Sequence, residues 1–140
     1  MTYGTLKSIT TGLLIGDNVL PSDGAVLIGL LEYAMSTVAM QADSLHLMTL
    51  NADANILRRA QGDYLIRTPS MPLTDDEHID IDDELAFAVA RYLASYVSRD
   101  KGGIHVQAAD RIIKDYNAKT WELLGSTLYT DAETGEQYVY

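Results

Sequence analysis

The fold is decided by residues 79–97, which read IDIDDELAFAVARYLASYV. The acidic residues 82–84 favour a helix start, because carboxylates stabilise the positive end of the helix dipole. Beyond them, one row of large apolar side chains and one row of alanines predict two packing stripes. The apolar ridge is Leu85, Val89, Leu93 and Val97, and the alanine strip is Ala86, Ala90 and Ala94. We expect one stripe to face the domain's core and the alanine strip to receive a neighbouring subunit, although the sequence alone does not assign the two.

The same helix is predicted to end at the glycine pair 102–103, because glycine is the residue that most readily ends a helix. Arg99 and Lys101 precede this pair and match the negative end of the helix dipole. A second amphipathic helix is predicted over residues 105–124. The short link between them predicts an antiparallel helix pair.

A third helix, over about residues 23–40 with Ser22 as its N-cap, is apolar on nearly every side. Glu32 is the one charged residue between positions 24 and 42, and acidic residues flank the segment. These features predict a buried helix rather than a membrane span. One chain of 140 residues has little material to surround such a helix. We therefore expect neighbouring copies to cover it, through side chains that include Leu30 and Tyr33.

The remaining segments complete a mainly α fold in a single domain, residues 1–140, with a helical core over 22–124. A short amphipathic helix is possible within residues 1–21. Two β-compatible runs around a glycine-containing turn predict a β-hairpin within residues 56–68. We thus expect a small bundle of three to four helices with a hairpin insertion. Residues 125–140 predict an extended or hairpin C-terminal arm, which either folds back on its own domain or adds to another chain's sheet.

The composition gives little support to nucleic-acid binding or catalysis. The net charge is -10, and Arg58, Arg59 and Arg67 are the one basic feature, a possible contact with DNA or an acidic partner. Ion pairs with the chain's own carboxylates are the favoured role for these arginines. The chain has no cysteine and no local pattern of metal ligands or of an activated nucleophile. We therefore expect no enzyme activity, no catalytic residues, no cofactor and no metal.

The acidic segment, residues 75–84, is the one place where a divalent cation is conceivable. It lacks the glycine and the ligand spacing of a calcium loop. A solvated connector running into a helix start explains its charge better.

In the order of its parts, the chain resembles the head-to-tail connector (adaptor) proteins of tailed bacteriophages. The resemblance covers roughly residues 22–124 and rests on four features of the sequence. These are an apolar helix, a hairpin insertion ending in Pro69-Ser70-Met71-Pro72, the start Asp82-Asp83-Glu84-Leu85 of an alanine-rich helix, and a last helix with Ala108-Ala109 and Asp115-Tyr116-Asn117.

The resemblance implies a structural virion protein. Such proteins form a homo-oligomeric ring, commonly of twelve copies, between the portal protein and the tail or nozzle proteins. DNA passes through the ring without specific binding. The resemblance implies a place in the virion neck after assembly in the host cytoplasm, with no membrane contact. It also implies portal docking through the C-terminal arm, with Tyr129, Tyr138, Val139 and Tyr140 as the candidate contacts.

Two other functions are conceivable from the sequence. One is a neck or tail-completion protein of different stoichiometry. The other is a small metal-dependent enzyme that uses the acidic segment.

Overall fold

The computed structural model describes the backbone of residues 1–98, 102–127, 129–130 and 137–138, and the side chains of residues 1–98 and 102–123. The described part is mainly helical with a small antiparallel sheet, as predicted. The helices are α1 (Tyr3–Leu13), α2 (Gly24–Gln41), α3 (Asp83–Val97) and α4 (Gly102–Thr127). The strands are β1 (Met48–Thr49), β2 (Ile56–Arg59), β3 (Leu65–Arg67), β4 (Tyr129–Thr130) and β5 (Gln137–Tyr138).

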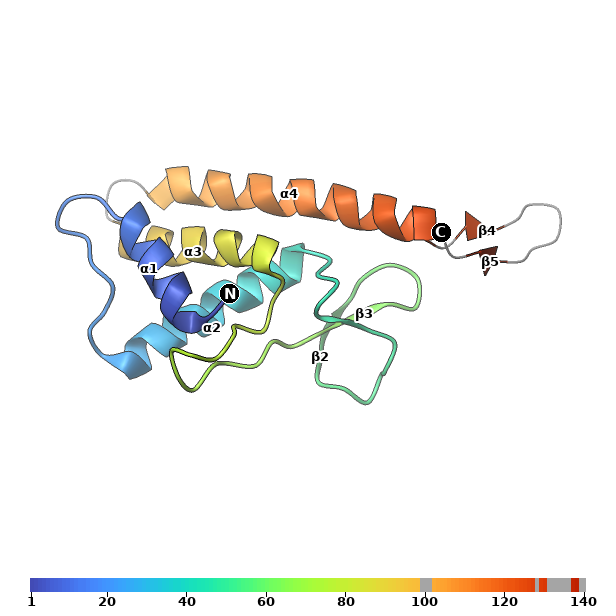
Figure 1. Cartoon of the computed structure of the whole chain (residues 1–140), viewed down its shortest axis with the longest axis horizontal. Helices are drawn as coiled ribbons and strands as arrows, with labels where there is room; N and C mark the ends of the chain where they lie inside the picture. Colours follow the sequence, from blue (N-terminus) through green and yellow to red (C-terminus); the bar gives the residue numbers. More distant parts are fainter. Residues whose placement is uncertain (99–101, 128, 131–136, 139–140) are drawn as a thin grey trace.

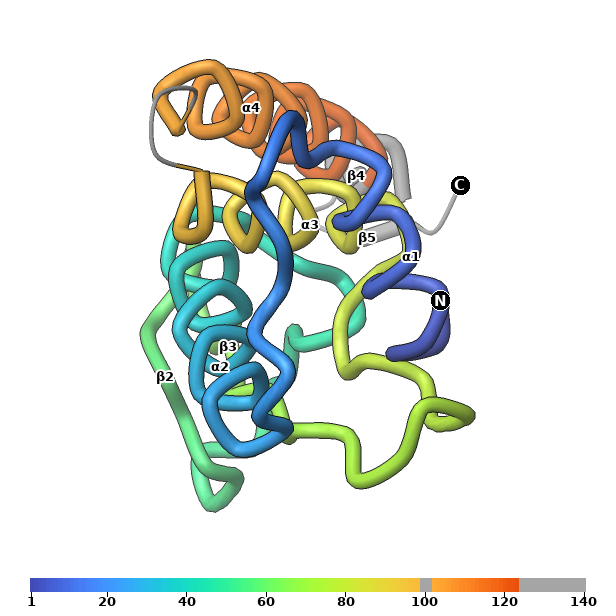
Figure 2. The backbone as a smooth tube through the Cα atoms, turned by 90° about the vertical axis from the view of Figure 1, so that its left-hand side faces the viewer, coloured from blue at the N-terminus to red at the C-terminus, as the bar shows by residue number. Residues whose placement is uncertain are grey.

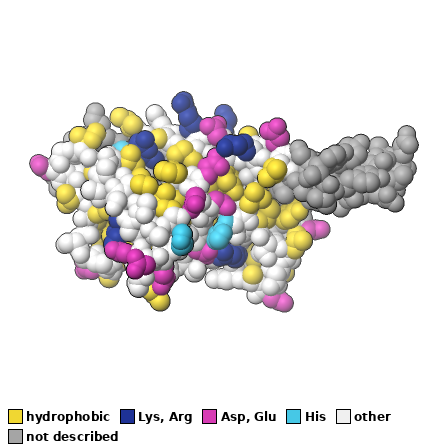
Figure 3. Space-filling model, in the orientation of Figure 1, with side chains coloured by type: hydrophobic (Ala, Val, Ile, Leu, Met, Phe, Trp, Pro, Cys, Tyr) yellow, Lys and Arg dark blue, Asp and Glu magenta, His cyan; other side chains and the backbone are white. Residues whose placement is uncertain are grey.

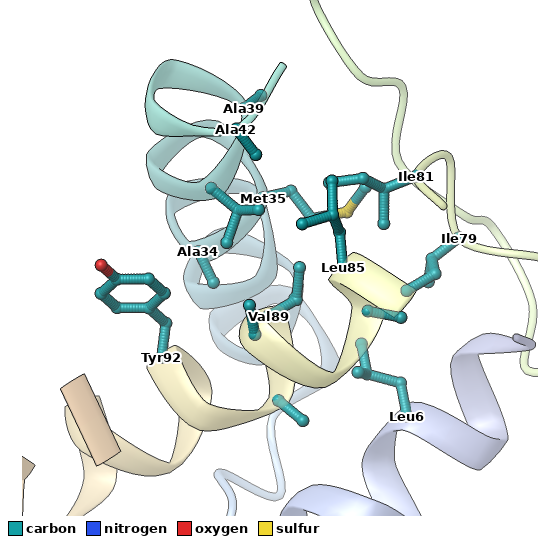
Figure 4. Close-up of a cluster of buried hydrophobic side chains, with 14 of the residues drawn as sticks. Leu6, Ala34, Met35, Ala39, Ala42, Ile79, Ile81, Leu85, Val89 and Tyr92 are labelled. Atoms are coloured by element: carbon teal, nitrogen blue, oxygen red, sulfur yellow. The ribbon is translucent and has the colours of Figure 1, made fainter. Parts of the chain in front are cut away.

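Helix α3 lies at the centre of the helical body. Helices α4, α1 and α2 each pack against it, and α4 runs antiparallel to it (Figures 1 and 2). Figure 4 shows Leu85 and Val89 of α3 directed toward Met35 and Ala34 of α2, while Leu6 approaches from α1. Burying each large aliphatic side chain contributes roughly 1.5–3 kcal/mol. The apolar ridge therefore faces the chain's own core, as one of the two stripes was expected to do.

The alanine strip was expected to receive a neighbouring subunit, and this expectation is wrong. Ala86, Ala90 and Ala94 are all fully buried within the single chain. Their small side chains let helices of the same chain approach α3 closely on this side. The two stripes thus hold neighbouring helices of the same chain, and no side chain of the strip is accessible to a second copy.

The three-stranded sheet has β3 in the middle, with β1 and β2 antiparallel on either side. Strands β2 and β3 form the predicted hairpin. Gly62 sits in its turn with a φ of 58°, a conformation that favours glycine. The buried side chain of Ile66 on β3 attaches the sheet to the core. Strand β1 was not anticipated, because the segment around residues 43–55 has no clear alternation of apolar residues.

Several helix ends differ from the predicted ones. The glycine pair does not end α3, which stops at Val97; instead it begins α4. A Cβ atom on Gly102 would lie 3.2 Å from the carbonyl oxygen of Ser95, so glycine allows the close approach of the two helices here. Asp23, rather than Ser22, caps α2 by accepting a 2.9 Å hydrogen bond from the amide of Ala25. Helix α4 extends three residues beyond its predicted end at Leu124.

Helix α2 is covered on one face only. Leu27, Leu31 and Val38 are buried against the body, whereas Tyr33 is 65% and Met40 52% exposed. By length and composition, this helix is apolar enough to cross a membrane, with a mean hydropathy of 1.3, and a third of it is buried in the protein. The opposite face remains open to solvent within the chain that the structure describes.

We expect Ala90→Leu to destabilise the protein by about 1–3 kcal/mol, because the added atoms overfill a close helix contact on α3. Thermal unfolding followed by circular dichroism measures this effect. Ala118→Leu adds the same atoms to the exposed face of α4 and serves as the matched control, with an expected change within about 0.5 kcal/mol. Equal melting temperatures for Ala90→Leu and the unmodified protein would contradict the close packing described above.

Candidate functional site

The acidic segment contains the densest cluster of ionisable groups, and Asp80 is its most connected member. Its carboxylate accepts two hydrogen bonds from the guanidinium of Arg67, at 2.5 and 2.8 Å. Ser70 donates to the same carboxylate through its amide, at 2.9 Å, and through its hydroxyl, at 3.1 Å. Nε2 of His46 lies 2.7 Å from Oδ1. Asp80 thus joins β3 to the segment before β1 and to the loop after β3.

These contacts favour the charged form of Asp80. The hydrogen bonds from Arg67 are the main reason that the pKa of this carboxyl lies well below its usual range, and the Ser70 amide adds to the effect. Partial burial opposes the shift. A bidentate arginine–carboxylate pair fixes the geometry of both side chains as well as attracting them. Asp80 is therefore a structural anchor rather than a proton donor near neutral pH.

Asp82 occupies the N-cap position of α3, but its side chain does not cap that helix. Its carboxylate instead accepts hydrogen bonds from Ser44 Oγ at 2.6 Å, the Tyr116 hydroxyl at 2.9 Å and the His46 amide at 3.0 Å. Burial raises the pKa of Tyr116 to about 12, so its hydroxyl keeps the donated proton. One carboxylate therefore connects α3, α4 and the segment after α2.

Four other carboxylates of the acidic segment also have separate partners. Asp75 pairs with Lys7 at 2.7 Å, and Glu84 pairs with Lys119 at 2.6 Å. Glu77 accepts a hydrogen bond from the amide of Leu73 at 2.9 Å. The Met1 amino group pairs with Asp83. These contacts are largely exposed and contribute little each, but they direct the carboxylates toward different elements rather than one shared point.

A small cleft of about 220 Å³ lies beside this segment. His46, His78, Glu77 and Asp80 are among its lining residues. Figure 3 shows two histidine side chains beside acidic side chains on one face of the molecule. Within the described residues, no group of three His, Cys, Asp or Glu side chains is arranged to hold a metal ion.

Two of the three candidate basic residues are engaged within the chain. Nε of Arg58 donates to the carbonyl of Ala39 at 2.9 Å and Nη2 to that of Ala42 at 2.8 Å, so Arg58 caps the C-terminal end of α2. Arg58 also pairs with Asp43 at 2.9 Å. Arg67 is held by Asp80, as described above. Arg59 is exposed on the hairpin and lies opposite Leu65 rather than Arg67.

The candidate subunit contacts fall into two groups. The alanine strip is buried, whereas Tyr33 is largely exposed and Leu30 is half-buried. The ring centroids of Tyr33 and of Tyr96 on α3 are 5.3 Å apart, so Tyr33 packs against α3. Leu30 and Tyr33 therefore belong to a surface that another chain can reach.

The C-terminal arm contains a short strand pair. Tyr129 lies opposite Tyr138 and Thr130 opposite Gln137 in β4 and β5, which corresponds to the predicted hairpin. The two strands lie beyond the C-terminal end of α4, away from α1 (Figure 1). Val139 and Tyr140, the other two candidate docking residues, lie outside the described residues.

The contacts that attach α4 to the segment after α2 were not predicted. Asn117 accepts a hydrogen bond from the Asp43 amide at 2.7 Å and donates one to the Gln41 carbonyl at 2.9 Å. Trp121 donates to the Asp43 carboxylate at 2.6 Å. These partners are more than 70 positions apart in the sequence, so no local pattern points to them.

An open groove of about 990 Å³ separates α1 from the first turns of α2. Its walls mix apolar with polar side chains, and its single basic residue, Lys7, is already paired with Asp75. Lys7 also lies 4.7 Å above the ring of Tyr3. The described lining residues of this groove do not form the set of converging polar groups that is typical of a ligand-binding site.

Fold and site together define a small, mainly α-helical protein whose acidic segment is a structural hub. Comparisons of this chain with models of protein families, with curated proteins and with solved structures found no match.

We expect Asp82→Asn to destabilise the fold by about 1–3 kcal/mol, because an amide replaces a carboxylate that three donors share. Urea unfolding, followed by the fluorescence of the single tryptophan, Trp121, measures the loss. Asp76→Asn removes one charge at an exposed position of the same segment and should change stability by less than about 0.5 kcal/mol. Equal losses in the two variants would show that charge, rather than the hydrogen bonds, matters.

Asp80 should give the protein part of its acid sensitivity. Because its pKa is lowered on folding, its contribution is present above the unfolded-state pKa of about 3.9 and is lost as the pH falls toward the folded-state value. Asp80→Asn should therefore be less stable at pH 7 and show a shallower loss of stability below about pH 4. Urea unfolding over this pH range tests both expectations. If the free energy of unfolding changed with pH in the same way for Asp80→Asn and the unmodified protein, this contribution of Asp80 would be ruled out.

Proposed function

We propose that this protein is a structural subunit of a tailed-bacteriophage neck, in which about twelve copies form a ring between the portal and the tail. The observation that carries the proposal is the exposed apolar face of α2, which includes Leu30 and Tyr33. An open, largely apolar helix face, on which Glu32 is the one charged residue, is typical of a surface that another protein covers. A ring requires a heterologous contact that closes, with this face packed against a different surface of the next copy.

The distribution of charge supports the same proposal. The net charge is -10, and the carboxylates with buried or half-buried partners are used to hold the fold together. The remaining exposed carboxylates give the surface a negative potential, which repels the phosphates of DNA. A channel with such a wall lets DNA pass without specific binding. Such a protein would be assembled in the host cytoplasm and act in the virion neck, without a membrane.

The C-terminal arm is the proposed portal-docking element, with contacts from Tyr129, Tyr138, Val139 and Tyr140. A lone pair of two-residue strands is marginal in water and gains stability when it adds to another sheet. Its place beyond the end of α4 leaves it accessible to a partner (Figure 1). In this arrangement, the helical body builds the ring and the arm attaches it.

The test is assembly with a portal protein. We expect the purified protein, mixed with the portal of its own phage, to form particles with a ring of density that contains many copies of the 15.4 kDa chain. Electron microscopy shows the ring and its symmetry. A protein that stays monomeric with the portal and is absent from virions would refute the proposal. A ring of other symmetry would instead indicate another neck or tail-completion protein.

Deleting residues 128–140 should prevent portal attachment while leaving the helical body folded, because α4 ends at Thr127. Co-sedimentation with portal particles measures attachment, and far-ultraviolet circular dichroism measures folding. Tyr64→Ala, a change of a tyrosine outside the arm, is the matched control and should retain attachment. A truncated protein that still binds the portal would assign docking to the helical body.

A further inference from the structure

His105, close to the start of α4, is the buried histidine of this chain. It is 5% exposed, whereas His46 and His78 both lie on the surface. Its imidazole faces α3, where Nη1 of the half-buried Arg91 lies 3.2 Å from Nδ1. The contact between α3 and α4 therefore contains a group that titrates near neutral pH and a permanent positive charge next to it.

The contact with Arg91 determines the protonation state of His105. A guanidinium has only donors, so Nδ1 accepts this hydrogen bond and carries no proton. The imidazole is therefore neutral, with its one proton on Nε2. A second proton, on Nδ1, would point at the guanidinium and place two positive charges side by side in a buried contact. Protonation of His105 and the hydrogen bond from Arg91 thus exclude each other.

No carboxylate of the described residues forms an ion pair with either group. The chain has 20 acidic and 10 basic residues, and its other half-buried arginines, Arg58 and Arg67, are each paired with an aspartate. The link between the two helices, residues 99–101, lies outside the described residues and has two basic residues and one acidic residue. A proton on His105 would therefore add to a positive charge that no described acidic side chain neutralises.

The other charged groups of the four helices have partners elsewhere or are exposed to solvent. Those with partners are Asp110 with the Tyr92 hydroxyl, Glu84 with Lys119, Asp83 with the Met1 amino group, and Lys7 with Asp75. Those that are exposed are Glu32 of α2 and Arg111, Lys114, Asp115 and Glu122 of α4. Arg91 is therefore the charge that His105 meets across the helix contact.

Helix α4 is attached to the body at two separate places. Its first turns lie along the last turns of α3 (Figure 1), in the same contact as His105. Its later turns are held by the side chains of Tyr116, Asn117 and Trp121, which form hydrogen bonds with residues 43–45. The second attachment does not involve His105. Loosening of the first turns therefore leaves the later turns in place.

We propose that His105 is a pH-sensitive switch between α3 and α4: the neutral imidazole holds the first turns of α4 against α3, and the protonated imidazole releases them. Burial and, to a smaller extent, the charge of Arg91 lower the pKa of His105 below its usual value of 6.5. Because the pKa is lower in the folded protein, the stabilisation is complete above about pH 6.5 and is lost as the pH falls below this value toward the folded-state pKa. The proposal does not depend on the neck function.

Nuclear magnetic resonance of the imidazole nitrogens tests the protonation state directly. The unmodified protein should carry the His105 proton on Nε2 at about pH 7 and titrate with a midpoint below 6.5. Arg91→Gln keeps an N–H donor for Nδ1 but removes the positive charge, so the midpoint should rise. A proton on Nδ1, or the same midpoint in Arg91→Gln, would overturn the proposal.

Hydrogen exchange followed by mass spectrometry tests the release. After correction for the intrinsic effect of pH on exchange, the protection of residues 103–110 should fall about threefold or more between about pH 7 and about pH 5. The protection of residues 113–121 should remain. His105→Gln does not titrate, and its amide oxygen still accepts a hydrogen bond from Arg91, so it should keep the same protection at both pH values. His78→Gln, which replaces an exposed histidine, is the matched control and should retain the loss.

Three exchange results would overturn the proposal. They are equal protection of residues 103–110 at the two pH values, the same loss in His105→Gln as in the unmodified protein, and a simultaneous loss along the whole of α4. The last of these would indicate general unfolding. The acid sensitivity expected from Asp80 appears below about pH 4, so it does not overlap with this range. If His105→Gln fails to fold, the titration of Arg91→Gln still decides the question.

Discussion

Helix α3 is surrounded by three other helices of its own chain, and the rest of the structure depends on this burial. The arrangement is possible because alanines on α3 occupy so little space that neighbouring backbones come close. The large ridge residues fill the wider gap toward α2, where Met35 and Ala34 meet Leu85 and Val89 (Figure 4). Close packing on several sides leaves little room for movement of α3. The acidic segment, which leads into the N-terminal end of α3, therefore holds a fixed position.

The acidic segment uses this fixed position. Asp82 lies at the start of α3 and accepts hydrogen bonds from the Tyr116 hydroxyl of α4 and the Ser44 hydroxyl after α2. It therefore connects two segments that are far apart in the sequence. Asp80, two residues earlier, holds the sheet through Arg67. A carboxylate with several aimed donors is costly to protonate and costly to move. The segment that looks most like a catalytic or metal site in the sequence is therefore better explained as a joint between the helical body and the sheet.

The sequence predicted the helices and the hairpin well, because periodicity and turn residues are local signals. Residues 83–97 form the expected helix, and Gly62 marks the expected turn. The sequence failed where the outcome depended on distant partners. An alanine strip suits a helix of the same chain as well as one of another chain, and only the position of α1 and α4 decides between them. The C-capping role of Arg58 likewise depends on where the sheet lies relative to α2.

The burial of the alanine strip changes where a second chain can bind. With both stripes of α3 used internally, the apolar surface that remains on a long helix is the exposed face of α2. Its residues were the least informative part of that helix in the sequence, because apolar side chains occur on every side of it. Once the buried face is known, Val26, Tyr33 and Met40 remain as the large apolar side chains of α2 that are at least half exposed. The apolar surface that a second chain can reach therefore lies at the edge of the fold rather than at its centre.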